Sequence, residues 1–283
     1  MKPGLKIGIV GKGGVGKTTV SSLLARTFAE RGLRVVAVDT DSNPNLGVSL
    51  GLDLAATEAI PVLPRSLVVG RHGDCGVDEL LTTYGVATPS GVTVLSALRV
   101  DEAGAGCTCG GHATVRSLLG EALDDEADVT IIDMEAGIEH LSRSGGTLAH
   151  ADILVIVMDP SRKSIVTAAR TIALADQLGI ARCVAIGNKA QLGDDVFFET
   201  HCAELAVPLV AVVPADSGIV DADRVGRQVR EGEANAVWPK SCFMVTGTVT
   251  PHSVCVSKRS GVRSGGTICV MAPTTGRHRR GVI

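Results

Sequence analysis

Short apolar runs alternate with segments of helical periodicity through most of the chain. We predict strands at Lys6–Val10, Arg34–Val38, Val92–Ser96, Val129–Ile132, Ile153–Met158, Cys183–Ile186 and Leu209–Val213. We predict helices at Lys17–Arg31, Val115–Leu123, Ser161–Leu178, Asp194–Leu205 and Ile219–Arg230. This alternation predicts an α/β fold, a doubly wound and mostly parallel sheet with helices on both faces. The stretch 43–106, broken by prolines, is the least readable part of the pattern.

A glycine-rich segment joins the first predicted strand to the first predicted helix. It reads Gly11-Lys12-Gly13-Gly14-Val15-Gly16-Lys17-Thr18-Thr19 and meets the spacing G-x-x-x-x-G-K-[ST]. Glycines let the backbone curl so that several N–H groups point at one anion, and the helix N-terminus adds its own unpaired N–H groups. Lys17 can reach the β- and γ-phosphates, and the Thr18 hydroxyl can ligate Mg²⁺. The segment therefore predicts a nucleotide-binding P-loop.

The same glycines also satisfy a second fingerprint. Gly11, Gly13 and Gly16 fit G-x-G-x-x-G, and Asp39 lies near the distance of a ribose-binding acid. A hydride-transfer enzyme with a dinucleotide is thus the alternative. That fold has no use for Lys17-Thr18 after the last glycine, so the sequence favours the P-loop.

Acidic side chains follow two of the predicted strands. Asp39 and Asp41 come directly after Arg34–Val38, and Asp133 follows Val129–Ile132. Strand carboxyl ends and helix N-termini share one edge of a doubly wound sheet, so these carboxylates are expected near Mg²⁺ and the γ-phosphate. The alternative is that the Asp-x-Asp pair only caps the next turn. Asn188 ends a later strand, where its amide suits the adenine edge, although a turn-forming Asn is the alternative.

Two cysteines lie close together on a glycine-flanked segment. In extended backbone, Cys107 and Cys109 point the same way, so both thiolates could meet one metal ion. Two ligands do not complete a tetrahedral site, and a homodimer would supply the other two. Thiolates suit Zn²⁺ and Cu(I), and four sulfurs can also take Ni²⁺; His112 is an additional candidate ligand. On spacing alone, two buried or incidental thiols remain an equal alternative.

The extra lysine of the loop, Lys12, resembles the deviant Walker A motif of the MinD/ParA/nitrogenase-iron-protein class of ATPases. The resemblance implies ATP hydrolysis in a homodimer formed in the ATP state, with Lys12 reaching the partner's nucleotide. It also implies that Asp41 orients water, that Asp39 and Asp133 support Mg²⁺, and that the Gly137 N–H senses the γ-phosphate. The last expected contacts are Asn188 to adenine and the segment Pro214-Ala215-Asp216 beside the base.

Two further motifs look like the CooC family, the accessory ATPases for nickel insertion into carbon monoxide dehydrogenase. They are G-C-x-C-x-x-H-x-x-x-R, from Gly106 to Arg116, and D-M-x-A-G-I-E-H-L-x-R, from Asp133 to Arg143. The resemblance implies a dimer that binds Ni²⁺ or Zn²⁺ through Cys107 and Cys109 and has carbon monoxide dehydrogenase as client. The nitrogenase iron protein has a cluster cysteine where this chain has His140, so no iron–sulfur cluster is expected. A MinD/ParA-like positioning switch is the alternative function.

Composition sets the domain layout. Residues 1–236 are predicted to form one P-loop ATPase domain, with a core of Val, Ile, Leu and Ala because aromatic residues make up only 2% of the chain. Residues 237–283 carry seven basic residues and no acidic one, and two hypotheses are an aberrant C-terminus or a basic arm of low order. The remaining body is acidic, so no nucleic-acid partner is expected. We find no signal peptide or apolar run of about 18 residues and predict a cytoplasmic protein without a membrane span.

Overall fold

The described residues of this computed structural model are 4–64, 76–100, 109–118, 126–138, 141, 147–180 and 182–228. All of them belong to one compact unit, Met1–Pro239. The predicted tail 237–283 lies outside the described residues, and its boundary stays a prediction.

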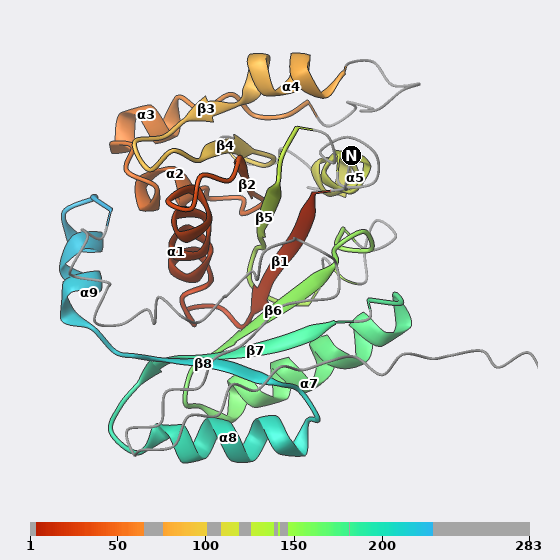
Figure 1. Ribbon diagram of the computed structural model, residues 1–283, viewed down its shortest axis with the longest axis vertical. Coiled ribbons are helices and arrows are strands. Elements are labelled where there is room, and N and C mark those ends of the chain that lie inside the picture. Colours follow the sequence, from red (N-terminus) through yellow and green to blue (C-terminus); the bar gives the residue numbers. More distant parts are fainter. Residues whose placement is uncertain are drawn as a thin grey trace, which may run out of the picture. The chain divides into compact units, whose positions relative to one another are not determined.

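One mixed sheet forms the centre of this unit (Figure 1). Its described strands run in the order β3-β4-β2-β5-β1-β6-β7-β8, and all neighbours are parallel except β3 and β4. The strands are β1 Leu5–Gly11, β2 Val35–Asp39, β3 Val86–Ala87, β4 Thr93–Ser96, β5 Val129–Asp133, β6 Ile153–Met158, β7 Cys183–Ala190 and β8 Leu209–Pro214. The predicted doubly wound α/β fold is confirmed, and the short antiparallel edge strand β3 is an addition to it.

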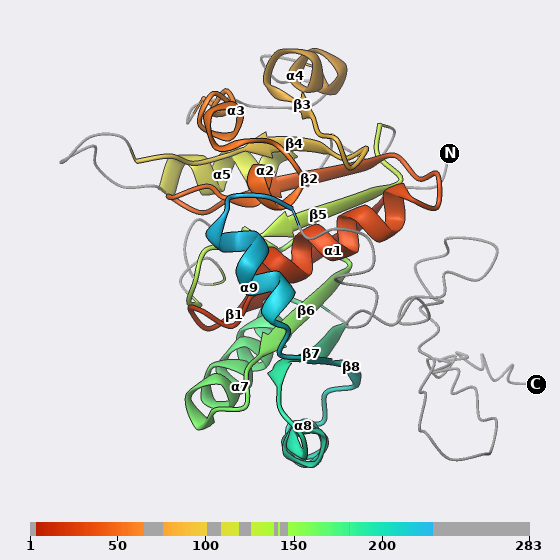
Figure 2. The same ribbon diagram turned by 90° about the vertical axis from the view of Figure 1, so that its left-hand side faces the viewer.

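Helices cover both faces of the sheet. The described helices are α1 Lys17–Ala29, α2 Leu46–Ser49, α3 Leu54–Glu58, α4 Val77–Tyr84, α5 Cys109–Ser117, α7 Arg162–Gln177, α8 Asp194–Glu204 and α9 Ser217–Arg224. Figure 1 shows α1 and α5 on opposite sides of β5. Figures 1 and 2 agree that α3 and α4 lie at the β3–β4 end of the sheet and that α7 and α8 lie at the β6–β8 end.

Two helices begin earlier than the sequence pattern predicts. α5 starts at Cys109 instead of Val115, because its first turn is built of glycines and polar residues that give no periodic signal. α9 starts at Ser217, where the Asp216 carboxylate accepts a hydrogen bond from Gly218 N at 2.6 Å, and it ends at Arg224. The boundaries of α1, α7 and α8 agree with the predictions to within two residues.

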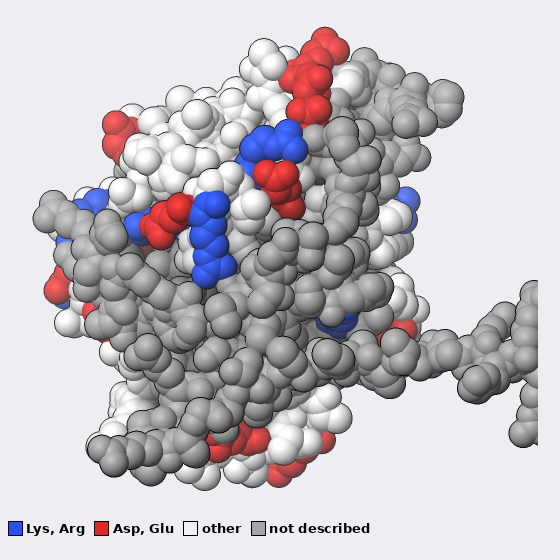
Figure 3. All heavy atoms as spheres, in the orientation of Figure 1, with Lys and Arg blue, Asp and Glu red and all other residues white. Residues whose placement is uncertain are grey.

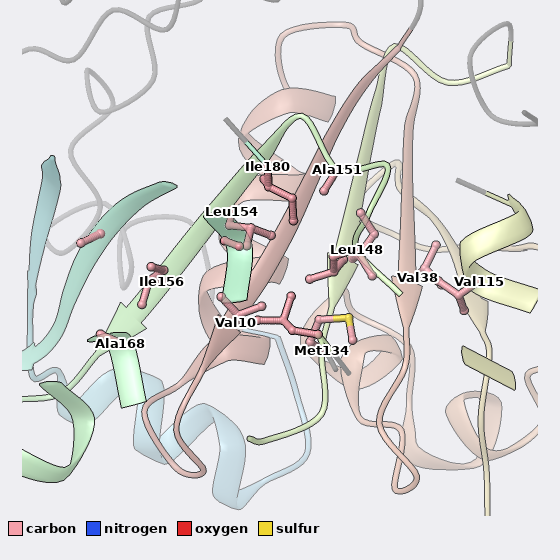
Figure 4. Packing of buried hydrophobic residues seen from close by; sticks show 14 of the residues in the cluster. Val10, Val38, Val115, Met134, Leu148, Ala151, Leu154, Ile156, Ala168 and Ile180 are labelled. Atoms are coloured by element: carbon pink, nitrogen blue, oxygen red, sulfur yellow. The ribbon is translucent and has the colours of Figure 1, made fainter. Parts of the chain in front are cut away.

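Period-two alternation along the strands sends side chains to two separate apolar layers. On one face, the buried cluster joins Val10 of β1 and Val38 of β2 to Val115 of α5 and Ala168 of α7. Figure 4 shows Val115 directed at Val38 and Met134 beside Val10. On the other face lies α1, which contacts β1, β2 and β5 and buries apolar side chains such as Leu24 and Phe28. The two layers fix α1 and α5 against the central strands.

Charged side chains are interspersed on the face drawn in Figure 3. Where described residues show on that face, Lys and Arg lie among Asp and Glu and form no continuous patch of one sign. None of the described helices is both long and apolar enough to cross a lipid bilayer.

The contact between β7 and α8 gives a test of the fold. A Cβ placed on Gly187 would lie 2.6 Å from ring carbons of Phe198, which is fully buried. We expect Gly187→Ala to lower the free energy of unfolding by about 1–3 kcal/mol, because the ring has to move in a packed core. Urea unfolding measures this change. Gly76→Ala is the control, since a Cβ there meets no atom; an equal loss in both variants would contradict the contact.

Candidate functional site

Four strands deliver their carboxyl ends to one edge of the sheet, and the predicted nucleotide site lies there. The segment Lys12–Gly16 leaves β1 at this edge and leads into α1. Asp39 and Asp133 are the last residues of β2 and β5 and lie directly opposite each other in the parallel register. Asn188 belongs to β7, on the other side of β1. The sheet thus brings together the groups that the sequence pattern assigns to phosphate, metal and base.

Backbone conformation and close contacts explain why the loop has glycine at three positions. Gly11, Gly14 and Gly16 have φ values of 151°, 80° and 93°, which favour glycine over residues with a Cβ. A Cβ at Gly11 would also collide with the Val157 carbonyl oxygen, and one at Gly16 would collide with the Asn188 amide. The loop conformation therefore leaves no room for a side chain at Gly11 and Gly16 and disfavours one at Gly14.

The first turn of α1 holds the charged groups at the centre of the site. Lys17 is the first residue of the helix and is buried, with its Nζ 3.5 Å from the Lys12 carbonyl oxygen. The Ser21 hydroxyl donates to Asp133 Oδ1 at 2.8 Å, and the Thr18 hydroxyl also donates to this carboxylate. Asp133, Thr18 and Lys17 therefore lie together, as predicted for a phosphate and Mg²⁺ site.

Both carboxylate oxygens of Asp39 accept hydrogen bonds from backbone N–H groups. Its Oδ1 accepts a hydrogen bond from Asp41 N at 3.0 Å, and its Oδ2 accepts from Asn45 N and Leu46 N at 3.0 and 2.9 Å. The capping role weighed as an alternative in the sequence is thus present in the structure. The role of Asp39 at Mg²⁺ stays a prediction.

Electrostatics at this edge favour a bound cation. Burial raises the pKa of Asp39, and the neighbouring Asp133 raises it further. Burial likewise raises the pKa of Asp133, against the effect of hydrogen bonds from Thr18 and Ser21 and of Lys17. Burial lowers the pKa of Lys17, against the attraction of Asp133, Asp41 and Glu135. Two buried carboxylates beside a threonine hydroxyl are oxygen ligands that suit Mg²⁺, so the donor set fits this metal.

Two segments next to the site are hydrogen-bonded to each other. The Thr40 N–H and hydroxyl both donate to the Asp133 carbonyl oxygen, at 3.0 and 2.8 Å. The Ser42 hydroxyl donates to Glu135 Oε1 at 3.1 Å. Asp41, the predicted water-orienting residue, lies between these two contacts and is partly exposed. The segment after β2 is therefore held to the segment after β5.

Gly137 lies against the loop. It has a φ of 108° and forms an isolated antiparallel bridge with Gly11. Gly137 therefore lies beside the start of the loop, and its predicted contact with the γ-phosphate stays a prediction.

Strand β7 contributes two side chains to the loop. The Asn188 Nδ2 donates to the Val15 carbonyl oxygen at 2.7 Å, and the Lys189 Nζ donates to the Gly14 carbonyl oxygen at 2.7 Å. Lys189 is a residue that the sequence analysis missed, because only the asparagine of the Asn-Lys pair was considered. Pro214 pairs with Ala190 across β7 and β8, which places the predicted base segment near Asn188.

The cysteine pair cannot be described at the level of side chains. Cys107 lies outside the described residues, and of Cys109 only its position as the first residue of α5 is described. Among the residues whose side chains are described, no three of His, Cys, Asp and Glu come together as a metal site. The predicted nickel or zinc site stays a prediction.

Comparisons with known proteins agree with this geometry. Residues 8–229 match the model of the CobQ/CobB/MinD/ParA nucleotide binding domain. Carbon monoxide dehydrogenase accessory protein CooC of Rhodospirillum rubrum is 37% identical over 236 residues, which cover 78% of this chain and 88% of that protein. The septum site-determining protein MinD of Synechocystis sp. is 31% identical over 217 residues, covering 74% of this chain and 75% of that protein.

A solved structure shows the same fold. MinD of Pyrococcus horikoshii OT3, complexed with Mg-ADP, superposes with a TM-score of 0.65 at 22% identity and covers 85% of this chain and 95% of that chain. The matched domain, the relatives and the P-loop geometry lead to one assignment. The chain is an ATPase of the CobQ/CobB/MinD/ParA nucleotide-binding family and belongs, within it, to the CooC family.

Proposed function

We propose that this ATPase is a dimeric metallochaperone that binds nickel and assists its insertion into carbon monoxide dehydrogenase or a similar metalloenzyme. The observation that carries the proposal is that both flanks of the cysteine segment are attached to the nucleotide site. On one side, Val100 N donates to the Ser42 carbonyl oxygen at 3.1 Å, next to Asp41. On the other side, α5 begins at Cys109 and packs Val115 against Val38, one residue before Asp39. The similarity to CooC supports the same reading.

Hydrolysis of ATP to ADP and phosphate requires positioning and charge stabilisation more than covalent chemistry. Lys17 and the N–H groups of the loop bind the phosphates, and Thr18 with Asp133 would hold Mg²⁺, which neutralises phosphate charge when bound. Asp41 orients the attacking water, and its place between the Thr40 and Ser42 contacts, which join the segments after β2 and β5, suits that role. Lys12 acts on the transition-state charge of the partner's nucleotide in the dimer.

The orientation of the Asn188 amide supports the proposed recognition of adenine. A carbonyl oxygen can only accept, so the atom 2.7 Å from the Val15 oxygen has to be Nδ2. This contact fixes the amide and leaves Oδ1 as an acceptor for a donor group. The exocyclic amino group of adenine is such a donor, whereas guanine presents an oxygen at that position.

The cysteines give the dimer its proposed cargo. One chain supplies two thiolates from Cys107 and Cys109, and a second copy related by twofold symmetry supplies two more. A four-sulfur site accepts Ni²⁺ or Zn²⁺, with nickel as the metal to be delivered. MinD relatives make the positioning switch the second candidate, and nickel binding by the cysteine pair distinguishes the two functions.

The action of Lys12 across a dimer can be tested by mixing inactive variants. We expect Asp41→Ala to lower ATP turnover by about 100-fold or more while ATP still binds. We expect Lys12→Ala to lose turnover as well. A heterodimer of the two variants has one site with its own Asp41 and an intact Lys12 from the other subunit, so the mixture should recover about a quarter of the wild-type rate. The measurement is phosphate release; no recovery on mixing would show that Lys12 acts within its own chain.

The carboxylate pair predicts an unusual pH dependence of stability. The folded-state pKa values of Asp39 and Asp133 are raised, so the folded protein binds protons more tightly than the unfolded chain at these groups. Without nucleotide or divalent cation, we expect the free energy of unfolding to be larger at about pH 6 than at about pH 8, because stability is lost as the pH rises through the raised pKa values. Mg-ADP should weaken or reverse this trend, since the metal needs ionised ligands.

Urea unfolding at both pH values measures this dependence, and Asp133→Asn should reduce it. A slope that is unchanged in the variant would contradict the assignment to this pair.

Nickel binding tests the proposed function directly. We expect the Cys107→Ala/Cys109→Ala protein to bind nickel at least about tenfold more weakly than the wild type in the ATP-bound state, because all protein thiolates of the site are lost. Equilibrium dialysis of the Asp41→Ala background keeps ATP intact during the measurement. Cys183→Ala is the matched control, because this half-buried thiol lies in β7 and burial raises its pKa. Equal affinity in the double variant and the wild type would reject the metallochaperone.

A further inference from the structure

Strand β7 is irregular where it passes the phosphate-binding loop. Its register against β8 shifts between Gly187 and Ala190, and Lys189 has a φ of 57°. A left-handed backbone is unfavourable for a residue with a Cβ, and glycine would avoid that cost. Lys189 keeps this conformation with its side chain exposed, except for the contact of its Nζ with the Gly14 carbonyl oxygen. The strand deformation therefore aims this ammonium group at the loop.

The contacts from β7 fix the orientation of two successive peptide planes. Lys189 holds the carbonyl of Gly14, and Asn188 holds the carbonyl of Val15. In a trans peptide the C=O and the following N–H point in opposite directions, and the described chain has no cis peptide. The N–H groups of Val15 and Gly16 therefore point away from β7.

The loop itself supports this orientation. The Val15 N–H makes a long hydrogen bond of 3.5 Å to the carbonyl oxygen of Lys12. The Lys17 Nζ lies 3.5 Å from the same oxygen. The N–H of Val15 and the ammonium of Lys17 thus converge on the interior of the loop, where an anion would replace these long contacts.

We propose that Lys189 is a positioning residue that holds the phosphate-binding loop in its anion-binding conformation by fixing the Gly14 carbonyl outward. Its ammonium group does not touch the nucleotide in this role; it acts on the Val15 N–H through the peptide plane. The loop is rich in glycine and has many other accessible conformations, so a fixed carbonyl reduces the entropy that phosphate binding has to overcome. The inference rests on the ATPase activity of the family and is independent of the nickel proposal.

If Lys189 positions the loop, its loss should weaken binding of the phosphate chain whether or not the nucleoside is present. Lys189→Met removes the ammonium group and keeps the aliphatic stem. We expect the dissociation constants of Mg-ATP and of inorganic tripolyphosphate with Mg²⁺ to rise by the same factor, about fivefold to tenfold, as a charge-assisted hydrogen bond is lost. Lys189→Arg should restore most of the affinity, because a guanidinium can donate to the same carbonyl. Displacement of a fluorescent ATP analogue measures both ligands.

Two control variants separate the effect of the Lys189 side chain from the effects of its backbone conformation and of net charge. Lys189→Gly loses the same contact but relieves the left-handed backbone, so it should bind as weakly as Lys189→Met while unfolding at an equal or higher urea concentration. Arg170→Met removes one positive charge from an exposed position of α7 and should bind both ligands like the wild type.

Three outcomes would overturn the proposal. They are unchanged tripolyphosphate binding in Lys189→Met, weakening confined to ATP, which would assign Lys189 to the base, and failure of Lys189→Arg to recover affinity. A wild-type protein that binds neither ligand would instead reject the ATPase assignment.

Discussion

Two carboxylates buried side by side are the constraint on which this site depends. Asp39 and Asp133 end neighbouring parallel strands in direct register, and both are almost completely removed from solvent. Burying like charges together costs several kcal/mol unless other groups compensate. Backbone N–H groups compensate Asp39, and hydroxyl groups together with Lys17 compensate Asp133. Because those donors belong to the loop helix and to the segment after β2, satisfying the acids also places Lys17 and Asp41.

The sequence predicted those parts of the structure that follow from local pattern. Strands such as β6 are continuous apolar runs, so their existence and parallel arrangement could be predicted from composition and periodicity. Within the stretch 43–106 only the strand β4 was predicted, because α2 and α3 have four and five residues and give too few turns for a periodic signal. The edge strand β3 has only two residues. Short elements of this kind are defined by tertiary contacts.

The same distinction holds for the site: some of its residues belong to sequence motifs, and others are defined only by tertiary contacts. The loop, Asp133 and Asn188 could be named as candidates because motif spacing or a place at a strand end marks them in the sequence, and the structure brings them to one edge of the sheet. The capping by Asp39 could be named only as an alternative, since the same carboxylate can bind a metal or accept three N–H groups. Lys189 could not be found, because its partner is a backbone carbonyl 175 residues away in the chain. Every residue has a backbone carbonyl, so the type of the acceptor residue does not reveal such a hydrogen bond.

The hydrogen bonds around the loop also indicate which part of the site is held least firmly. Strand β7 holds the loop through Asn188 and Lys189, and α1 holds it through the buried first turn. The segment after β2 is held by Asp39, but its contact with the segment after β5 includes one half-buried bond from Ser42 to Glu135. Such a bond is worth only about 1 kcal/mol, less than a magnesium ion and a γ-phosphate can supply by binding to neighbouring groups. Ser42 also accepts the bond from Val100, seven residues before Cys107. A change at the Ser42–Glu135 contact would therefore act on Val100, the last described residue before the cysteine segment.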